Sequence, residues 1–216
     1  MHVAYAKVSE WAKHNSFGKT WRLERMKQFL ALVKPPAGAK IIDLGGHLPM
    51  WQWFDHDFEV TLDNLPGSYK RTGKFGQYTF MEGDATNLSE NFADKSFDIV
   101  FSNSVIEHVG DESKQADFAS EVMRLAKGYW VQTPSNYWPI EPHTGVVGYW
   151  LLPKFVQENL QKSWVKELPV WTEMVRTTTV LSRKRMRELF PDSKLYIERK
   201  FLLEKSYATY KPFEAE

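Results

Sequence analysis

Short apolar runs alternate with stretches of helical periodicity along most of the chain. Five of these runs have the length and composition of buried strands. They lie at residues 40–44, 58–62, 78–82, 97–101 and 129–132. Apolar residues at helical spacing predict one helix over about 21–33 and another that contains Phe118, Val122 and Leu125, with Gly128 just past its end. Strands that alternate with helical crossovers predict a mainly parallel sheet with helices on both faces.

The alternation breaks after the fifth predicted strand. Residues 135 to about 180 are rich in Trp, Tyr, Pro and Gly, with one helical stretch near 154–161. A helix at 182–190 and two strands at 194–200 and 204–210 are predicted next. The short link between these two strands indicates an antiparallel edge on the sheet.

We therefore expect a single α/β domain over residues 1–216. It would have a Rossmann-like, mainly parallel, seven-stranded sheet with helices on both faces and an antiparallel edge strand. About residues 1–38 would form an N-terminal helical extension, and about 135–180 an aromatic-rich insertion.

Composition narrows the class of protein. With 43% hydrophobic and 25% charged residues, the chain has the composition of a globular domain. A formal net charge of +1 gives no overall attraction to nucleic acid or anionic membranes. The absence of cysteine excludes disulfides, thiolate metal sites and cysteine nucleophiles. No secretory signal and no apolar run of transmembrane length is found, so we expect a cytoplasmic location.

Glycines and polar residues collect where the predicted strands end. Asp43, Gly45 and Gly46 follow the first apolar run, and paired glycines let a ligand approach the backbone closely. Asp63 closes the second strand, where a dinucleotide-binding fold places an acid on ribose hydroxyls. A solvated loop acid is the simpler alternative for Asp63. Asp84 ends the third strand, and it either faces the same crevice or forms a turn.

In this order and at these spacings, the features resemble the class I S-adenosylmethionine-dependent methyltransferases, and most closely the type 11 group of small members. Four motifs carry the resemblance. They are Ile42-Asp43-Leu44-Gly45-Gly46, Leu62-Asp63, Glu82-Gly83-Asp84-Ala85 and the run from Phe97 to His108. The resemblance covers about residues 39–133, with a weaker match over 182–210.

The resemblance implies an enzyme that uses S-adenosylmethionine as its cofactor, without a metal. It places Asp63 at the ribose and Asp84 at the adenine amino group, with Ala85 beside the ring. It turns Ser102 and Asn103 toward the sulfonium and the methyl acceptor, although a turn is an alternative role for Asn103. The full predicted cofactor site is Asp43, Gly45, Gly46, Asp63, Asn64, Asp84, Ala85, Ser102 and Asn103.

One position departs from the family pattern. Leu48 stands where a third glycine often lies, and the bulky run that continues to Trp51 suits a pyrophosphate poorly. S-adenosylmethionine has no phosphate, so this departure argues against a nicotinamide-dependent dehydrogenase. The same departure is compatible with two alternatives: a protein that binds the cofactor weakly, and a protein that binds it without catalysing a reaction.

Two histidines are predicted as catalytic residues. An oxygen or nitrogen acceptor can need a general base, and without cysteine the candidates are histidines and carboxylates. His143 lies in Pro139-Ile140-Glu141-Pro142-His143 after the fifth strand, and His108 follows the fourth. The alternatives are a loop histidine bonded to backbone for His143 and a positional role near the cofactor for His108.

Large aromatic residues gather in the insertion. They are Tyr137, Trp138, Tyr149, Trp150, Trp164 and Trp171. Flat aromatic faces can hold sugars, rings or lipid-like groups, so we interpret 135–180 as a lid over the acceptor. A small satellite core under a long loop is the alternative. The basic run Arg183-Lys184-Arg185-Met186-Arg187 is interpreted as a solvated helix face.

The acceptor is predicted to be a small molecule. Thr133-Pro134-Ser135-Asn136 and the following Pro139–His143 run look like bacterial members linked to surface-glycan synthesis, which suggests a sugar or sugar-lipid hydroxyl. A methyltransferase of RNA or protein is one alternative, although the charge balance does not favour nucleic acid as a partner. A non-catalytic module that binds S-adenosylmethionine is another, and the oligomeric state is left open.

Overall fold

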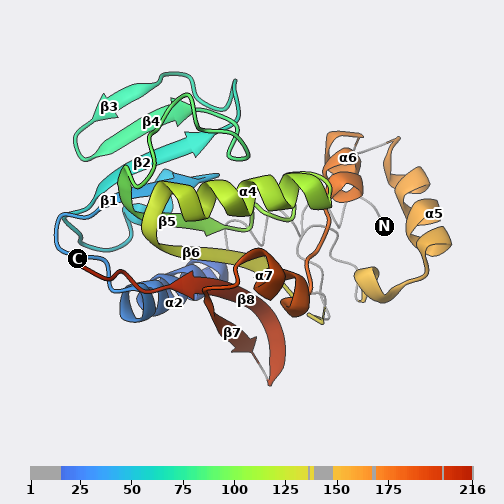
Figure 1. Cartoon of the computed structure of the whole chain (residues 1–216). Helices are drawn as coiled ribbons and strands as arrows, with labels where there is room; N and C mark the ends of the chain where they lie inside the picture. Colours follow the sequence, from blue (N-terminus) through green and yellow to red (C-terminus); the bar gives the residue numbers. More distant parts are fainter. Residues whose placement is uncertain (1–15, 136, 139–147, 167–168, 201, 216) are drawn as a thin grey trace.

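The computed structural model describes residues 16–135, 137–138, 148–166, 169–200 and 202–215 (Figure 1). The strands are β1 (Lys40–Leu44), β2 (Glu59–Asn64), β3 (Gly73–Phe75), β4 (Tyr78–Glu82), β5 (Phe97–Asn103), β6 (Ala126–Pro134), β7 (Lys194–Lys200) and β8 (Leu203–Lys211). The helices are α2 (Ser16–Val33), α3 (Leu48–Trp51), α4 (Glu112–Leu125), the short 3₁₀ helix η1 (Tyr149–Leu151), α5 (Lys154–Trp164), α6 (Pro169–Thr177) and α7 (Arg183–Leu189).

The strands form one sheet in the order β3-β4-β2-β1-β5-β6-β8-β7. The five strands from β4 to β6 in this order are parallel neighbours. β8 pairs antiparallel with β6, and β7 pairs antiparallel with β8. The strand order reverses at β1, between β2 and β5, which is the switch point where open α/β sheets bind ligands. The predicted Rossmann-like, mainly parallel sheet with an antiparallel edge is confirmed.

The sheet has eight strands where the sequence predicts seven. The additional strand, β3, pairs antiparallel with β4 at the edge of the sheet. Its residues Gly73, Lys74 and Phe75 are all exposed, so no buried apolar run marks it in the sequence. The two-residue link Gly76-Gln77, with a φ of +63° at Gly76, closes this hairpin.

Helices cover both faces of the sheet because successive strand residues point to opposite sides. Ile42 of β1 belongs to one core cluster together with Phe118 of α4. Its neighbour Ile41 belongs to a second cluster, together with Phe29 of α2 and Trp51 of α3. Figure 1 shows α4 lying along one face of the sheet. The two clusters hold the strand ends at fixed positions for the site described below.

Helix α4 passes into β6 without a loop. Asp111 caps the helix by accepting hydrogen bonds from the backbone N–H groups of Ser113 and Lys114, at 3.1 and 3.0 Å. The strand begins at Ala126, so Gly128 lies inside β6 and does not end the helix as predicted. A Cβ on Gly128 would lie 2.9 Å from Ile99 Cδ1. Close packing between strands, and not a turn, requires glycine there.

The predicted insertion contains η1, α5 and α6. In Figure 1, α5 and α6 lie beyond the end of the sheet toward which β2, β4 and β5 point. Tyr149, Trp164 and Val175 form a small core of their own, with Leu152 and Leu160 packed against it. Within the described ranges, every helix is too short or too polar to span a bilayer.

Candidate functional site

The first strand ends in a turn that leaves no room for side chains. Gly45 has a φ of +76°, a conformation that favours glycine, and a Cβ there would collide with the side chain of Val105. A Cβ on Gly46 would lie 2.6 Å from Leu62 Cδ2. The N–H of Gly45 donates to the carbonyl oxygen of Asp63 at 2.8 Å. The two predicted elements, the glycine turn and the end of β2, are therefore in direct contact.

Asp63 is a buried carboxylate without a partner. The residue is 1% exposed, and neither of its oxygens has a hydrogen-bond partner among the described residues. Burial, and secondarily the charge of Asp84, raises the pKa of Asp63 to about 7. A Cβ on Gly83 would lie 2.7 Å from Asp63 Oδ1, so a side chain at this position would crowd the carboxylate. A ligand that brings hydroxyl donors would satisfy it, which is what ribose offers.

Asp43 and Asn64 hold the shape of the turn. Asp43 is 1% exposed and accepts a hydrogen bond from Trp51 Nε1 at 2.8 Å, and burial raises its pKa to about 7. Asn64 donates from Nδ2 to the carbonyl oxygen of Gly46 at 2.9 Å and to the hydroxyl of Tyr69. Both side chains thus have protein partners that fix α3 and the turn around Gly46.

Asp84 lies at the end of β4, next to Ala85, and has the geometry of a turn. Its Oδ1 accepts hydrogen bonds from the backbone N–H and the hydroxyl of Thr86, at 2.9 and 2.7 Å. Asp84 is exposed, and Ala85 is half-buried. The charge of Asp84 contributes to the raised pKa of Asp63, as expected for two carboxylates at neighbouring strand ends.

The end of β5 presents two side chains with different surroundings. Ser102 is fully buried, and its hydroxyl donates to the carbonyl oxygen of Leu44 at 3.0 Å, which ties β5 to β1. Asn103 is half-buried, with its Nδ2 4.0 Å from the sulfur of Met50. The hydroxyl of Ser102 is therefore used inside the sheet, whereas the amide of Asn103 lies at its edge.

A buried arginine orients Asn103, which sequence reasoning missed. Arg25 of α2 donates from Nη1 to Asn103 Oδ1 at 2.7 Å and to Gln132 Oε1 at 2.9 Å. Its Nη2 lies 2.8 Å from Glu198 Oε2, with both side chains 7% exposed. The hydroxyl of Ser206 donates to the same oxygen at 2.6 Å. A signal existed in the sequence, since Arg25 precedes Phe29 by four residues on the apolar face of the helix.

His108 connects the loop after β5 to the segment after α6. Its Nδ1 lies 3.1 Å from the hydroxyl of Thr178, and its Nε2 lies 4.0 Å from Glu107 Oε1. Buried Glu107 accepts hydrogen bonds from Thr133 Oγ1 at 3.0 Å and, on its carbonyl, from the N–H of Thr179 at 2.7 Å. His108 thus lies where the insertion returns to the sheet. His143 lies outside the described residues.

Three of the predicted aromatic side chains that the structure describes differ in their exposure. Tyr149 is fully buried and Trp164 is 7% exposed, and both belong to the small core. Tyr137 is 58% exposed and lies directly after the end of β6. The described part of this segment therefore contains the satellite core and one exposed aromatic ring, that of Tyr137.

The basic run on α7 is a solvated, ion-paired face. Arg183 lies 3.3 Å from Glu204 Oε1, and Lys184 lies 3.8 Å from Glu188 Oε1. Arg185 pairs with the second oxygen of Glu188 at 3.7 Å. These partners support the interpretation of the run as ordinary surface charge.

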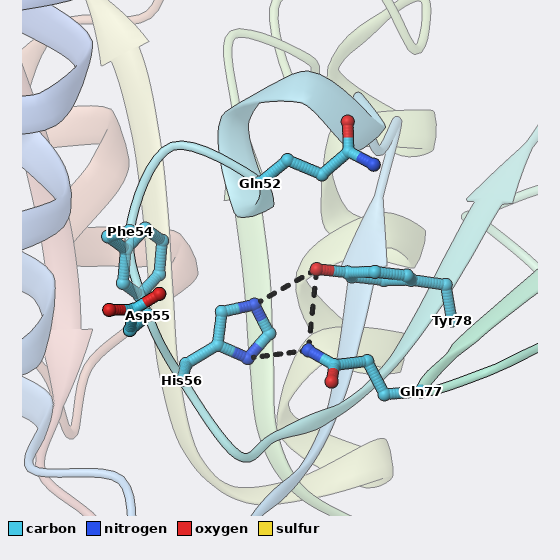
Figure 2. Close-up of a pocket in the computed structure, with 6 residues that line it drawn as sticks. All are labelled: Gln52, Phe54, Asp55, His56, Gln77 and Tyr78. Carbon is cyan, nitrogen blue, oxygen red and sulfur yellow. Dashed lines mark hydrogen bonds between the residues drawn. The ribbon is translucent and has the colours of Figure 1, made fainter.

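A separate pocket of about 330 Å³ lies at the opposite edge of the sheet (Figure 2). It is lined by Gln52, Phe54, Asp55, His56, Gln77 and Tyr78. The ring of His56 lies 3.3 Å from both the hydroxyl of Tyr78 and Nε2 of Gln77, and burial lowers the pKa of His56. Tyr78 begins β4, whereas Asp63 lies near the end of β2, so this pocket is distinct from the glycine-turn crevice.

Known proteins match both the sequence and the fold. The family model described as a methyltransferase domain matches residues 57–128, about a third of the chain. A S-adenosylmethionine-dependent methyltransferase from Archaeoglobus fulgidus is structurally similar with a TM-score of 0.60 and 11% identity, over 95% of this chain and 98% of that one. A search of curated proteins finds no match.

Two further structures share the fold. One is the methyltransferase in the complex with the Haloferax volcanii Trm112 methyltransferase activator, with a TM-score of 0.53, 16% identity, and 96% and 97% of the two chains covered. The other is a phosphoethanolamine N-methyltransferase of Haemonchus contortus, in complex with phosphomonomethylethanolamine and S-adenosylhomocysteine. It has a TM-score of 0.52 and 16% identity, with 82% of this chain and 39% of that chain covered.

The methyltransferase-domain match over residues 57–128 and the sheet order are consistent with the predicted resemblance to class I S-adenosylmethionine-dependent methyltransferases of the type 11 group. The chain is therefore an enzyme, and its cofactor is S-adenosylmethionine. The residues of the crevice fit this cofactor, because an unpartnered buried carboxylate and a turn without side chains lie side by side.

Proposed function

We propose that the enzyme methylates a hydroxyl group of a small molecule, a sugar or a sugar-lipid. The observation that carries the cofactor half of this proposal is Asp63, buried and without a partner beside the Gly45 turn. The acceptor half is supported by the insertion, which lies off the same edge of the sheet and brings the exposed ring of Tyr137 to the end of β6.

The cofactor contacts follow from the geometry of the strand ends. Asp63 would accept hydrogen bonds from the ribose hydroxyls, and the turn at Gly45 and Gly46 would let the ligand approach the backbone. Asp84 and Ala85 would border the adenine. Asn103 would lie nearest the transferred methyl group, because β5 adjoins β1 at the switch point.

The bound cofactor supplies a methyl group on a positively charged sulfur, ready for in-line transfer. The protein has to align the acceptor oxygen, keep water out and remove the hydroxyl proton. We assign proton removal to His143, with His108 as the second candidate. The small core of Tyr149 and Trp164 would give the insertion enough rigidity to position the acceptor.

Incubation with S-adenosylmethionine labelled in its methyl group tests the acceptor class. Candidate sugars, nucleotide-linked sugars, sugar-lipids, RNA and proteins are offered in parallel, and label is located by mass spectrometry. We expect label on a carbohydrate hydroxyl. Label on RNA or protein alone, or on nothing while the cofactor binds, would refute the proposal.

Asp63→Ala should weaken binding of S-adenosylhomocysteine by about 10-fold to more than 100-fold. The variant leaves the ribose hydroxyls without a charged acceptor, which costs about 1.5–3 kcal/mol. Asp63→Asn removes the negative charge of the side chain but keeps its size. Asp55→Asn, at an exposed residue on the opposite edge of the sheet, is the matched control. Calorimetry that shows equal affinity for Asp63→Ala and wild type would remove Asp63 from the cofactor site.

Asp63→Asn should stabilise the protein without bound cofactor at high pH. The pKa of Asp63 is raised in the folded state, so its ionisation opposes folding as pH rises from about 4 through about 7. Asp63→Asn should therefore melt at a higher temperature than wild type at pH 8, and this gain should disappear near pH 4. A variant that loses both cofactor binding and stability at pH 8 would show that Asp63 has a structural role instead.

Hydrogen exchange tests the insertion as an acceptor lid. Lids belong to the less stable part of a fold and often become ordered on ligand binding. Backbone amides in residues 135–180 should exchange more slowly when cofactor and acceptor are both bound. The amides of β1 and β5 serve as the internal reference. Protection of the insertion equal to that of these strands in the free protein would make it core and not a lid.

A further inference from the structure

Most of the exposed apolar side chains lie at one edge of the sheet. Among the described residues, eight large apolar side chains are exposed, and six of them belong to the insertion or to the turn of the β7–β8 hairpin. These six are Tyr137, Leu151, Phe155, Val165, Leu202 and Leu203. Because Pro134 at the end of β6 pairs with Ser206, the hairpin turn lies at the edge where the parallel strands end. In Figure 1 the helices of the insertion lie off the same edge.

Leu202 is the most exposed of these residues and the least expected at its position. Its side chain is 94% exposed, and its φ is +66°. A positive φ favours glycine or asparagine, so a leucine in this turn is strained. The leucine also gains no stability from burial within the chain. A strained apolar residue that lies almost wholly in solvent points to a contact outside the chain.

Helix α5 has a buried face and an exposed face of different character. Leu160 and Trp164 pack in the small core of the insertion. Phe155 is 66% exposed, and exposed Lys162, seven residues later, lies on the same side of the helix. Leu151, in η1 just before α5, is 67% exposed. The solvent side of η1 and α5 thus combines apolar residues with lysine, as helices at membrane surfaces do.

Positive charge accompanies the apolar side chains at both places. Residues 151–166 contain three lysines and one glutamate, a net charge of +2, whereas the whole chain has a net charge of +1. Beside the hairpin turn, Arg183 and Arg199 share a single carboxylate oxygen, Glu204 Oε1, at 3.3 and 3.7 Å. Cations therefore outnumber acids at both places, which favours an anionic partner.

We propose that this edge of the protein docks on an anionic lipid surface through Leu151, Phe155 and Leu202, with the lysines of α5 at the headgroups. Separate apolar side chains among cations suit a fluid lipid surface, whereas a protein partner calls for a contiguous apolar patch. The surface is separate from the cofactor crevice, so this inference goes beyond the proposed function. It would hold the acceptor side of the enzyme against a membrane, which favours a sugar-lipid over a soluble sugar.

Co-sedimentation of the full chain with sucrose-loaded vesicles tests the proposal. The vesicles contain phosphatidylcholine alone or phosphatidylcholine mixed with anionic phosphatidylglycerol. Wild type should bind the anionic vesicles at least about 10-fold more tightly, and less tightly at high salt. Phe155→Gln combined with Leu202→Asn should lower this affinity by roughly 10- to 100-fold. Lys162→Gln combined with Lys166→Gln should lower it by about 10-fold or more, since each lysine near an anionic surface contributes about five-fold.

Two controls separate lipid binding from folding. Phe75→Ser changes an exposed apolar residue at the opposite edge, where β3 meets the start of β4, and should leave vesicle binding as in wild type. Leu202→Asn should keep or raise the melting temperature, because asparagine adopts a positive φ more readily than leucine. Loss of vesicle binding in a variant of undiminished stability would therefore report the lost contact and not unfolding.

Three results would overturn the proposal. One is wild-type protein that binds neither kind of vesicle, and another is binding by Phe155→Gln with Leu202→Asn that equals wild type. The third is a wild-type dimer that these substitutions convert to a monomer, without vesicle binding, which would make a second copy of the chain the occupant. Calorimetry with S-adenosylhomocysteine on the same samples tests the cofactor site separately.

Discussion

Replacement of His143 with alanine is expected to lower turnover by roughly 10²- to 10⁴-fold, the usual contribution of a general base. His143 lies in the Pro139–His143 run after β6, where the flanking prolines restrict the backbone. A neutral imidazole near pH 7 can take the proton of a hydroxyl as the methyl group arrives. The measurement is single-turnover methyl transfer to the acceptor found by labelling, with the affinity for S-adenosylhomocysteine measured alongside.

The affinity should stay within about two-fold of wild type if His143 serves the acceptor and not the cofactor. His108→Ala is the parallel variant, and His56→Ala at the opposite edge of the sheet is the control. Full activity of His143→Ala would make this residue an ordinary loop histidine and leave His108 as the candidate. Weak cofactor binding without a separate loss of turnover would assign His143 to the donor pocket.

Arg25→Met is expected to destabilise the protein by about 3–5 kcal/mol, because it strands the buried carboxylate of Glu198 without its guanidinium partner. Removal also leaves the amide oxygen of Asn103 without this donor, and it leaves that of Gln132 with only the hydroxyl of Ser104. Urea denaturation of the free protein at pH 7 measures this loss. Arg176→Met, which breaks an exposed pair with Glu173, should cost less than about 1 kcal/mol.

The pH dependence of Arg25→Met follows from the same carboxylate. Burial alone would raise the pKa of Glu198, but the charges of Arg25 and Lys205 and the bond from Ser206 outweigh it, and its pKa falls to about 2. The stabilisation is therefore present above about pH 4.5 and is lost as pH falls toward 2. The gap between wild type and Arg25→Met should narrow over that range. A gap that is small at pH 7, or constant with pH, would contradict the network.

The sequence predicts the sheet well because each central strand is a short apolar run that ends in polar residues. β1, β4 and β7 are predicted with their observed bounds, and β2 and β5 within about two residues at each end. Elements without such a run are missed. β3 is exposed throughout, and α3 has only four residues, too few to show helical periodicity. α6 lies in a segment whose prolines and aromatics hide its period.

The sequence predicts only those residues of the candidate site that directly follow a predicted strand. Gly45 and Asp63 follow apolar runs, and they lie together because parallel strands end at one edge. The burial of Ser102 and the partners of Asp43 depend on packing between elements far apart in the chain, which no local pattern encodes. Arg25 joins α2 to β5, β6 and β7, so its role becomes visible only after folding.

The points at which the insertion leaves and re-enters the domain both contact one buried residue, Glu107. Glu107 contacts Thr133, just before the segment begins, and Thr179, where it ends. The described helices between these points have their own small core around Tyr149 and Trp164. Evolution can therefore exchange or lengthen this module without disturbing the sheet. An ancestral enzyme could change its acceptor in this way while it kept its methyl donor, and an engineer could graft another member's segment at the same two threonines.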